Sequence, residues 1–293
     1  MNLVRKIGAT LFSSVTFTVL FHAHWKQGVV CANLRHVSMD APEHRFYQRL
    51  LHNLARHAGE VLFRFGTFKK LPADTAAYPC RIDGLEFSLA EGSAPVLEKM
   101  RGGGIFLTAH YGNYEAIGPW LCRLQIPLVA SYIPLKPAWL NCILDQKIRA
   151  VDGRPYGVDA RTPREFLRLL GDGKLVCLLA DQDSRIPSAR DGEFAGVPVR
   201  NNPLPDFLLK HRPQTPVFIC WLEDSGNRRI LHAEEVSRST TGASPTEKDI
   251  ENSLSVMQPF NCWLEARIKE NPALWYGWTH RRFYSRNPEI YLG

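Results

Sequence analysis

The run Gly102–Glu115, GGGIFLTAHYGNYE, places a histidine and a carboxylate five positions apart. On one straight helix His110 and Glu115 would lie about 140° apart, because each residue turns about 100°, so they meet only if the chain bends between them. Gly112-Asn113 supplies a bend, and the apolar segment Ile105–Ala109 before it is typical of a buried strand. An ionised Glu115 in a first helical turn can orient His110 and stabilise its imidazolium, as His-dependent transfer to or from a hydroxyl requires. The alternative is a half-buried, hydrogen-bonded histidine whose spacing to a glutamate arises by chance.

The positive charge of the chain is concentrated at its N-terminus. Of the 293 residues, the first 70 hold ten Lys and Arg but three Asp and Glu, which accounts for the whole formal net charge of +7. The rest of the chain carries 26 basic and 26 acidic side chains, which argues against a basic nucleic-acid-binding core, so we expect no nucleic acid partner. An anionic surface near the N-terminus, such as a membrane, fits this distribution.

Two N-terminal segments have the composition of membrane-associated helices. Residues 7–21 are uncharged but short of the roughly 20 apolar residues of a comfortable transmembrane helix, so we interpret them as an uncleaved anchor or an interfacial helix. A buried core helix is the alternative. Residues 43–65 place apolar side chains on one face and arginines largely off it, so this helix either lies on a membrane or packs on the core with a solvated outer face.

The seven cysteines and ten histidines are dispersed, and none of them shows the spacing of metal ligands. The cysteines mostly lie in apolar runs, which is typical of reduced core residues that face a reducing compartment. Gly102-Gly103-Gly104 precedes its strand rather than following it, so it is no phosphate-binding loop. We therefore expect no metal and no cofactor.

From about residue 80 onward, short apolar runs alternate with helix-length segments, which predicts an α/β fold with a mixed, largely parallel central sheet flanked by helices. Residues 1–70 are predicted to form a membrane-associating helical segment and residues 71–293 the α/β domain. The long loop Asp181–Pro205 is predicted to be functional or mobile. The expected strands are Ile105–Ala109, Leu128–Tyr132, Leu175–Ala180, Val217–Leu222 and Ile230–Ala233, and the expected helices are Tyr114–Leu124, Ala138–Val151, Pro163–Leu170, Leu204–His211 and Glu247–Lys269.

Two polar segments are expected at one edge of this sheet. In open α/β sheets, ligands bind outside the carboxyl ends of the strands. His110 follows the first core strand and Asp181-Gln182-Asp183 follows the run Leu175–Ala180, so parallel strands would bring both to the same rim. Arg149 lies just before the Asp152-Gly153 turn, where it either caps a helix or has a functional role.

Several motifs, taken in order, resemble one family. The chain is similar to the bacterial lipid A biosynthesis acyltransferases of the lauroyl- and myristoyl-transferase type, within the lysophospholipid-acyltransferase-like group. The resemblance covers nearly the whole chain, including the basic, apolar N-terminus, with one departure at Phe194-Ala195-Gly196, where the family more often has two aromatics before the glycine. The motifs are HYGNYE at 110–115, Asn141 with Arg149 and Gly153, LLADQD at 178–183, FAGVP at 194–198 and WYGWTHRRF at 275–283.

The resemblance implies transfer of a fatty acyl chain from acyl carrier protein to a hydroxyl of a lipid A precursor, at the cytoplasmic face of the bacterial inner membrane. A thioester donor is already activated, so the reaction needs no nucleotide or metal. In this interpretation His110 is the general base and Glu115 orients it. Backbone amides near Gly112-Asn113 are candidate donors to the oxyanion.

Further residues are expected to bind substrate. Arg149 is the candidate for a phosphate or acceptor contact, and Asp181 would position the acceptor or the Arg149 side chain. Asn113 and Gln182 are further candidates. In the C-terminal motif we expect Trp275 and Trp278 to pack against the core and the arginines at 281 and 282 to lie at the surface.

Three other functions remain open from the sequence. The first is acyl transfer to a phospholipid or another glycolipid, with acyl-CoA as a further possible donor. The second is a non-catalytic, membrane-associated glycolipid-binding protein, against which the intact His110 and Glu115 pair argues. The third is a hydrolase, against which the absence of a G-x-S-x-G nucleophile motif argues.

Overall fold

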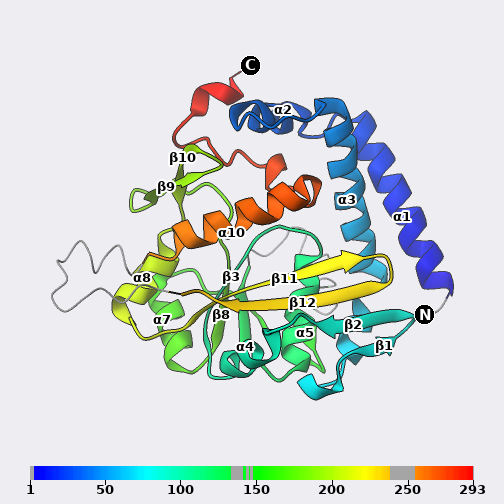
Figure 1. Cartoon of the computed structure of the whole chain (residues 1–293), viewed down its shortest axis with the longest axis vertical. Coiled ribbons are helices and arrows are strands. Elements are labelled where there is room, and N and C mark those ends of the chain that lie inside the picture. Colours follow the sequence, from blue (N-terminus) through cyan, green and yellow to red (C-terminus); the bar gives the residue numbers. More distant parts are fainter. Residues whose placement is uncertain (1–2, 133–140, 143–144, 146–147, 238–254, 293) are drawn as a thin grey trace.

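The computed structural model describes residues 3–132, 141–142, 145, 148–237 and 255–292. Within these residues eight strands form one mixed, largely parallel sheet in the order β1-β2-β12-β11-β3-β8-β4-β7 (Figure 1). All neighbouring pairs are parallel except β1 with β2 and β11 with β12. The predicted fold class is confirmed. The strands are β1 Cys80–Ile82, β2 Leu85–Leu89, β3 Gly104–Thr108, β4 Leu128–Ser131, β7 Gly157–Val158, β8 Leu175–Leu179, β11 Val217–Ser225 and β12 Arg228–Glu235.

The central strands are buried on both faces, which explains their nearly continuous apolar sequences. All five residues of β3 are buried. Alternate side chains of β11 enter different cores, with Ile219 on one side of the sheet and Cys220 on the other. The first core is closed by α3 (Glu43–Phe63), α7 (Pro163–Gly171), α8 (Leu204–His211) and α10 (Met257–Glu270), and the second by α4 (Ser93–Met100) and α5 (Ile117–Arg123).

The predicted strands and several predicted helices are confirmed within a few residues. The expected helix from Tyr114 begins as a 3-10 turn, Tyr114–Ala116, and continues as α5. Half of the expected helix Ala138–Val151 lies outside the described residues; residues 141, 142, 145 and 148 are helical, and the last two positions form the short strand β5 (Ala150–Val151). The predicted Asp152-Gly153 turn is confirmed, since it joins β5 to β6 (Arg154–Pro155) with positive φ at both residues.

The loop predicted for residues 181–205 contains a hairpin that the sequence analysis missed. β9 (Arg190–Phe194) pairs with β10 (Val197–Asn201) around a two-residue turn. Ala195 and Gly196 adopt φ values of 53° and 76°, the combination that a tight hairpin with a right-handed twist requires. The FAGVP motif is therefore the tip of this hairpin.

Three helices form the N-terminal segment, and α3 belongs to the core of the α/β sheet. Phe46 and Leu50 of α3 share one hydrophobic cluster with Ile105 and Leu107 of β3. The helix predicted for residues 43–65 therefore packs on the core, with Arg45 and Arg49 exposed, and its contact with a membrane stays a prediction. The helix α1 (Leu3–His22) packs along α3, and α2 (Gln27–His36) follows it (Figure 1).

The helix α1 presents an apolar stripe to solvent. Five of its side chains are between 49% and 72% exposed, and they recur every three or four residues: Val4, Ile7, Leu11, Val15 and Val19. No single helix among the described residues is long and apolar enough to cross a membrane. One pair of helical segments meets the length and hydropathy criterion for a membrane span when taken together, but it is bent by 78°: Lys6–His22 and Gln27–His36.

Candidate active site

His110 and Asp181 meet at the carboxyl edge of the sheet. β3 and β8 are parallel, and their register pairs Thr108 with Leu179. The pairing continues one step further, because the amide of Ala180 donates to the carbonyl of Thr108 at 3.0 Å. The two polar segments that follow these strands therefore arrive side by side, as the sequence predicted.

The Asp181 carboxylate binds the His110 ring and accepts two further hydrogen bonds. His110 Nδ1 lies 2.8 Å from Asp181 Oδ1, and the His110 amide donates to Oδ2 at 3.1 Å. Trp275 Nε1 also donates to Oδ2, at 2.8 Å. The Asp181 side chain is fully buried, whereas the His110 side chain is 19% exposed. With Nδ1 engaged by the carboxylate, Nε2 is the nitrogen left to receive a proton from a substrate.

The electrostatics of this pair favour a basic histidine. Burial by itself lowers the pKa of His110, but the charge and hydrogen bond of Asp181 outweigh it, and Glu115 adds to their effect, so the pKa of His110 is raised overall. Burial by itself raises the pKa of Asp181, but His110 and the indole of Trp275 more than compensate, so that this pKa falls below its usual value. Asp181 therefore stays ionised beside a protonatable ring.

Glu115 lies near His110 but is not its hydrogen-bonding partner. The predicted bend exists, since Gly112 has a φ of 57° and the 3-10 turn starts at Tyr114. The carboxylate that binds the His110 ring is nevertheless Asp181, so the expectation that Glu115 orients this ring is corrected. Burial raises the pKa of Glu115, while the charges of Arg149 and His110 oppose that rise. Glu115 acts on His110 through its charge.

Arg149 is part of a local polar cluster. It donates to Asp145 Oδ1 at 2.6 Å and to Asn141 Oδ1 at 3.3 Å. Its guanidinium lies 3.8 Å from the centre of the Tyr132 ring. Arg149 is thus in contact with Asn141 of the same family motif. Its positive charge also opposes the rise in the pKa of Glu115. Among the described residues Asp181 makes no hydrogen bond or ion pair with Arg149; the donors to its carboxylate are His110 and Trp275.

Asn113 differs from its predicted position, whereas substrate binding by Gln182 stays a prediction. The side chain of Asn113 is buried and donates to Glu60 Oε2 at 3.4 Å, so it faces the protein interior and not a substrate. Gln182 is exposed, and its backbone carbonyl accepts from Arg282 at 3.1 Å. The amide of Gly112 donates to the carbonyl of Leu274 at 2.9 Å, which removes it from the candidate oxyanion donors.

The profile of the family described as "Bacterial lipid A biosynthesis acyltransferase" matches residues 30–285. The chain belongs to this family. It is therefore an acyltransferase, with an acyl donor and a lipid acceptor. A search of curated proteins found no match.

The C-terminal motif of this acyltransferase packs beneath the site and contacts Asp181. Trp275 and Trp278 are fully buried, which confirms that they pack in the core, and the indole of Trp275 also holds Asp181. Arg282 is 1% exposed and donates to Asn201 Oδ1 at 2.7 Å, so the predicted surface role for this arginine is wrong. The exposed His280 lies with its ring centre 6.1 Å from that of His110.

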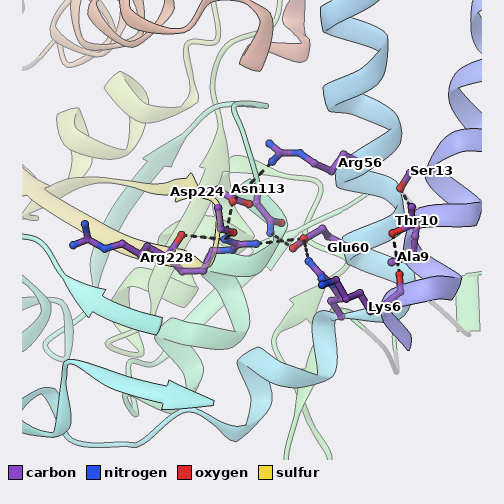
Figure 2. Close-up of polar contacts among 12 residues, drawn as sticks. Lys6, Ala9, Thr10, Ser13, Arg56, Glu60, Asn113, Asp224 and Arg228 are labelled. Atoms are coloured by element: carbon purple, nitrogen blue, oxygen red, sulfur yellow. Dashed lines mark hydrogen bonds and ion pairs between the residues drawn. The ribbon is translucent and has the colours of Figure 1, made fainter. Parts of the chain in front are cut away.

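A buried network of charges links α3 to the turn after His110 (Figure 2). Glu60 of α3 accepts from Arg64 at 2.7 Å, from Arg229 at 3.3 Å and from Asn113 at 3.4 Å. Arg229, whose side chain is 2% exposed, also pairs with Asp224 at 2.7 Å. Buried charges persist only when they are paired in this way, so the network fixes the active-site turn relative to α3 and the β11–β12 hairpin.

Metal chemistry has no structural support in the part of the chain that is described. No group of three or more His, Cys, Asp or Glu side chains there is arranged to hold a metal ion. The arrangement of a buried carboxylate, a histidine with a free Nε2 and a neighbouring second carboxylate is suited to general base catalysis.

Proposed function

We propose that this acyltransferase moves a fatty acyl group from acyl carrier protein to a hydroxyl of a lipid A precursor, with His110 as the general base. The observation that supports the mechanism is the hydrogen bond between His110 Nδ1 and the buried, ionised Asp181. It fixes the tautomer in which Nε2 is free to take a proton. Family membership supports the choice of an acyl donor and a lipid acceptor.

The proposed reaction uses groups that the chain itself supplies. His110 Nε2 takes the proton of the acceptor hydroxyl while its oxygen attacks the thioester carbonyl, and the ionised Asp181 and Glu115 stabilise the resulting imidazolium. The tetrahedral intermediate then collapses, the carbon–sulfur bond breaks, and the imidazolium returns its proton to the departing thiolate. An ester and a free thiol result, without oxidant, metal or cofactor. Base catalysis of this kind contributes about 10²–10⁴-fold.

We further propose that the enzyme works at the cytoplasmic face of the bacterial inner membrane. The exposed apolar stripe of α1 and the concentration of positive charge in residues 1–70 support this location. An amphiphilic helix of this kind can insert its apolar face at the headgroup boundary while the chain remains on one side.

The proposal is tested with membranes that contain wild-type enzyme, His110→Ala or Glu115→Ala. Each sample receives an under-acylated lipid A precursor and acyl carrier protein loaded with radiolabelled acyl chains of several lengths. Label on the glycolipid with wild type, and at least about 10²-fold less with His110→Ala, is the expected result. Equal transfer by the His110 variant would exclude this base. Label on phospholipid instead of glycolipid would show that the proposed acceptor is wrong. Transfer only from acyl-CoA would show that the proposed donor is wrong.

A further inference from the structure

A groove lined by cations runs along α3 beside the apolar helix α1. It has two adjoining parts, of about 360 and 560 Å³, which share Phe17, His52 and Arg56. Since one water occupies about 30 Å³ of liquid, each part has room for a phosphate with its attached polar group. We call the two parts together the basic groove, lined by residues that include Phe17, Arg49, His52, Asn53 and Arg56.

The basic side chains of the groove follow one face of α3. Arg49, His52 and Arg56 are separated by three and four residues, so they fall within about 60° of one another and span roughly 10 Å of helix. The ring of Phe17 on α1 contacts that of His52, at 6.0 Å between centres. The groove therefore lies between the basic face of α3 and the flank of α1.

The charge at the mouth of the groove is only partly neutralised by the two carboxylates in its lining, Glu60 and Asp224. In the interior, Arg229 forms an ion pair with Asp224 at 2.7 Å, and both Arg229 and Arg64 form ion pairs with Glu60. Arg56 approaches Asp224 only to 4.0 Å, and its side chain is 42% exposed.

Arg49 adds a second cation to the mouth of the groove. It is exposed, and it has no ion pair among the described residues. An anion in the groove would thus meet two guanidinium groups, the side chains best suited to bidentate phosphate binding.

The apolar stripe of α1 borders the same groove. At 100° per residue, the groove-lining Ser14 and Thr18 lie within about 60° of Leu11 around α1, so one edge of the groove adjoins the stripe. The ligand chemistry is therefore amphipathic, with an anionic head beside cations and acyl chains beside exposed valines and leucines.

We propose that the basic groove binds the phosphate of an anionic phospholipid headgroup, while the lipid chains contact the apolar stripe of α1. This does not depend on the proposed acyl transfer. Its position matters for the site, because Asn53 in the groove donates to the carbonyl of Ala273, and Tyr276 in that segment donates its amide to the carbonyl of His110. A bound headgroup thus contacts the segment that holds the catalytic histidine.

The test is the binding of the full chain to vesicles of pure phosphatidylcholine or of phosphatidylcholine with phosphatidylglycerol, measured by co-sedimentation. Arg49→Gln with Arg56→Gln is compared with Arg81→Gln and Arg168→Gln, which removes two exposed cations elsewhere. Each cation near an anionic surface changes binding about five-fold, so the groove pair is expected to lose roughly 25-fold on the anionic vesicles. The matched pair is expected to retain binding. Equal loss in both pairs, or no loss in the groove pair, would overturn the proposal.

Two further arms separate a phosphate site from diffuse attraction. Arg49→Lys with Arg56→Lys keeps the charge but loses the bidentate fork, so its binding should fall between wild type and the Gln pair, whereas wild-type binding would contradict a phosphate site. Titration with short-chain phosphatidylglycerol should give saturable heat. If inorganic phosphate binds and the short-chain lipid does not, the ligand of the groove is a free anion and the lipid proposal is wrong. Vesicle binding by His110→Ala should equal that of wild type, so failure of acyl transfer and failure of this site are distinguishable.

Discussion

Replacing Asp181 by asparagine should inactivate the enzyme although the two side chains have nearly the same shape. Three N–H donors converge on the carboxylate, one from the His110 ring on Oδ1 and two, from the His110 amide and the Trp275 indole, on Oδ2. An amide has a single oxygen. If that oxygen takes the position with two donors, its NH₂ group faces His110 Nδ1.

The amide then forces the wrong tautomer on His110. Nδ1 must accept a hydrogen bond, so the ring proton moves to Nε2, which can no longer take a proton from the acceptor hydroxyl. Loss of the correct tautomer in a serine protease triad costs about 10⁴-fold in kcat, and we expect a loss of the same order for Asp181→Asn. That is about 5 kcal/mol of transition-state stabilisation at 1.36 kcal/mol for each factor of ten.

Glu115→Gln is the matched control, because it also replaces one buried carboxylate by its amide. Glu115 acts on His110 through charge and not through the ring hydrogen bond, so we expect a loss of less than about ten-fold. The acid limb of the pH–rate profile should move to lower pH, since the charge that raises the pKa of His110 is weakened.

Two measurements check these expectations. Transfer of radiolabelled acyl chains gives kcat for both variants, and the ¹⁵N shifts of the His110 ring report which nitrogen carries the proton. The reasoning is refuted if Asp181→Asn stays within ten-fold of wild type while Glu115→Gln abolishes transfer, because Glu115 would then be the orienting group.

Three further predictions follow from buried groups. Trp275→Phe removes a hydrogen bond to the ionised Asp181, so urea unfolding should show a loss of about 1.5–3 kcal/mol, together with a lower kcat. Burial lowers the pKa of His57 to about 4, so the unfolded chain binds this proton first as the pH falls, and stability should drop by about 2 kcal/mol between pH 7 and pH 5. His57→Phe should flatten that slope, and an unchanged slope would contradict this assignment. Arg229→Met leaves Glu60 and Asp224 without their shared cation and should destabilise the fold by about 3–5 kcal/mol, whereas a neutral result would show that the network is dispensable.

The core of the fold could be predicted because it depends on local patterns. Continuous apolar runs bounded by glycines identified β3 and β8, and their parallel pairing followed from the alternation with helices. The β9–β10 hairpin was missed because its strands are short and polar, with a burial pattern that is mostly exposed in β9. Its turn also depends on a positive φ at Ala195, a residue type that seldom marks one.

The position of His110 at the carboxyl edge of the sheet could be predicted, but the carboxylate that binds its ring could not be chosen by spacing. Glu115 is five positions from His110 and Asp181 is 71 positions away, and the sequence analysis preferred the nearer carboxylate. A parallel sheet reverses that preference, since residues that follow neighbouring strands meet at one edge whatever their separation along the chain. The same applies to Trp275, 94 positions from Asp181, whose indole was expected only to pack.

The location of the arginines was hard to predict because exposure depends on partners that are remote in sequence. Arg282 is buried where four oxygen acceptors from three other segments converge on it, the carbonyls of Gln182 and Arg200 and the amide oxygens of Asn201 and Asn261. Arg49 has no such partner in the described part of the chain and is exposed on α3. A guanidinium is tolerated inside a protein only when its donors are satisfied, so a buried arginine indicates a structural contact. An exposed one that lines a groove is available to a ligand, and this distinction places the lipid site along α3.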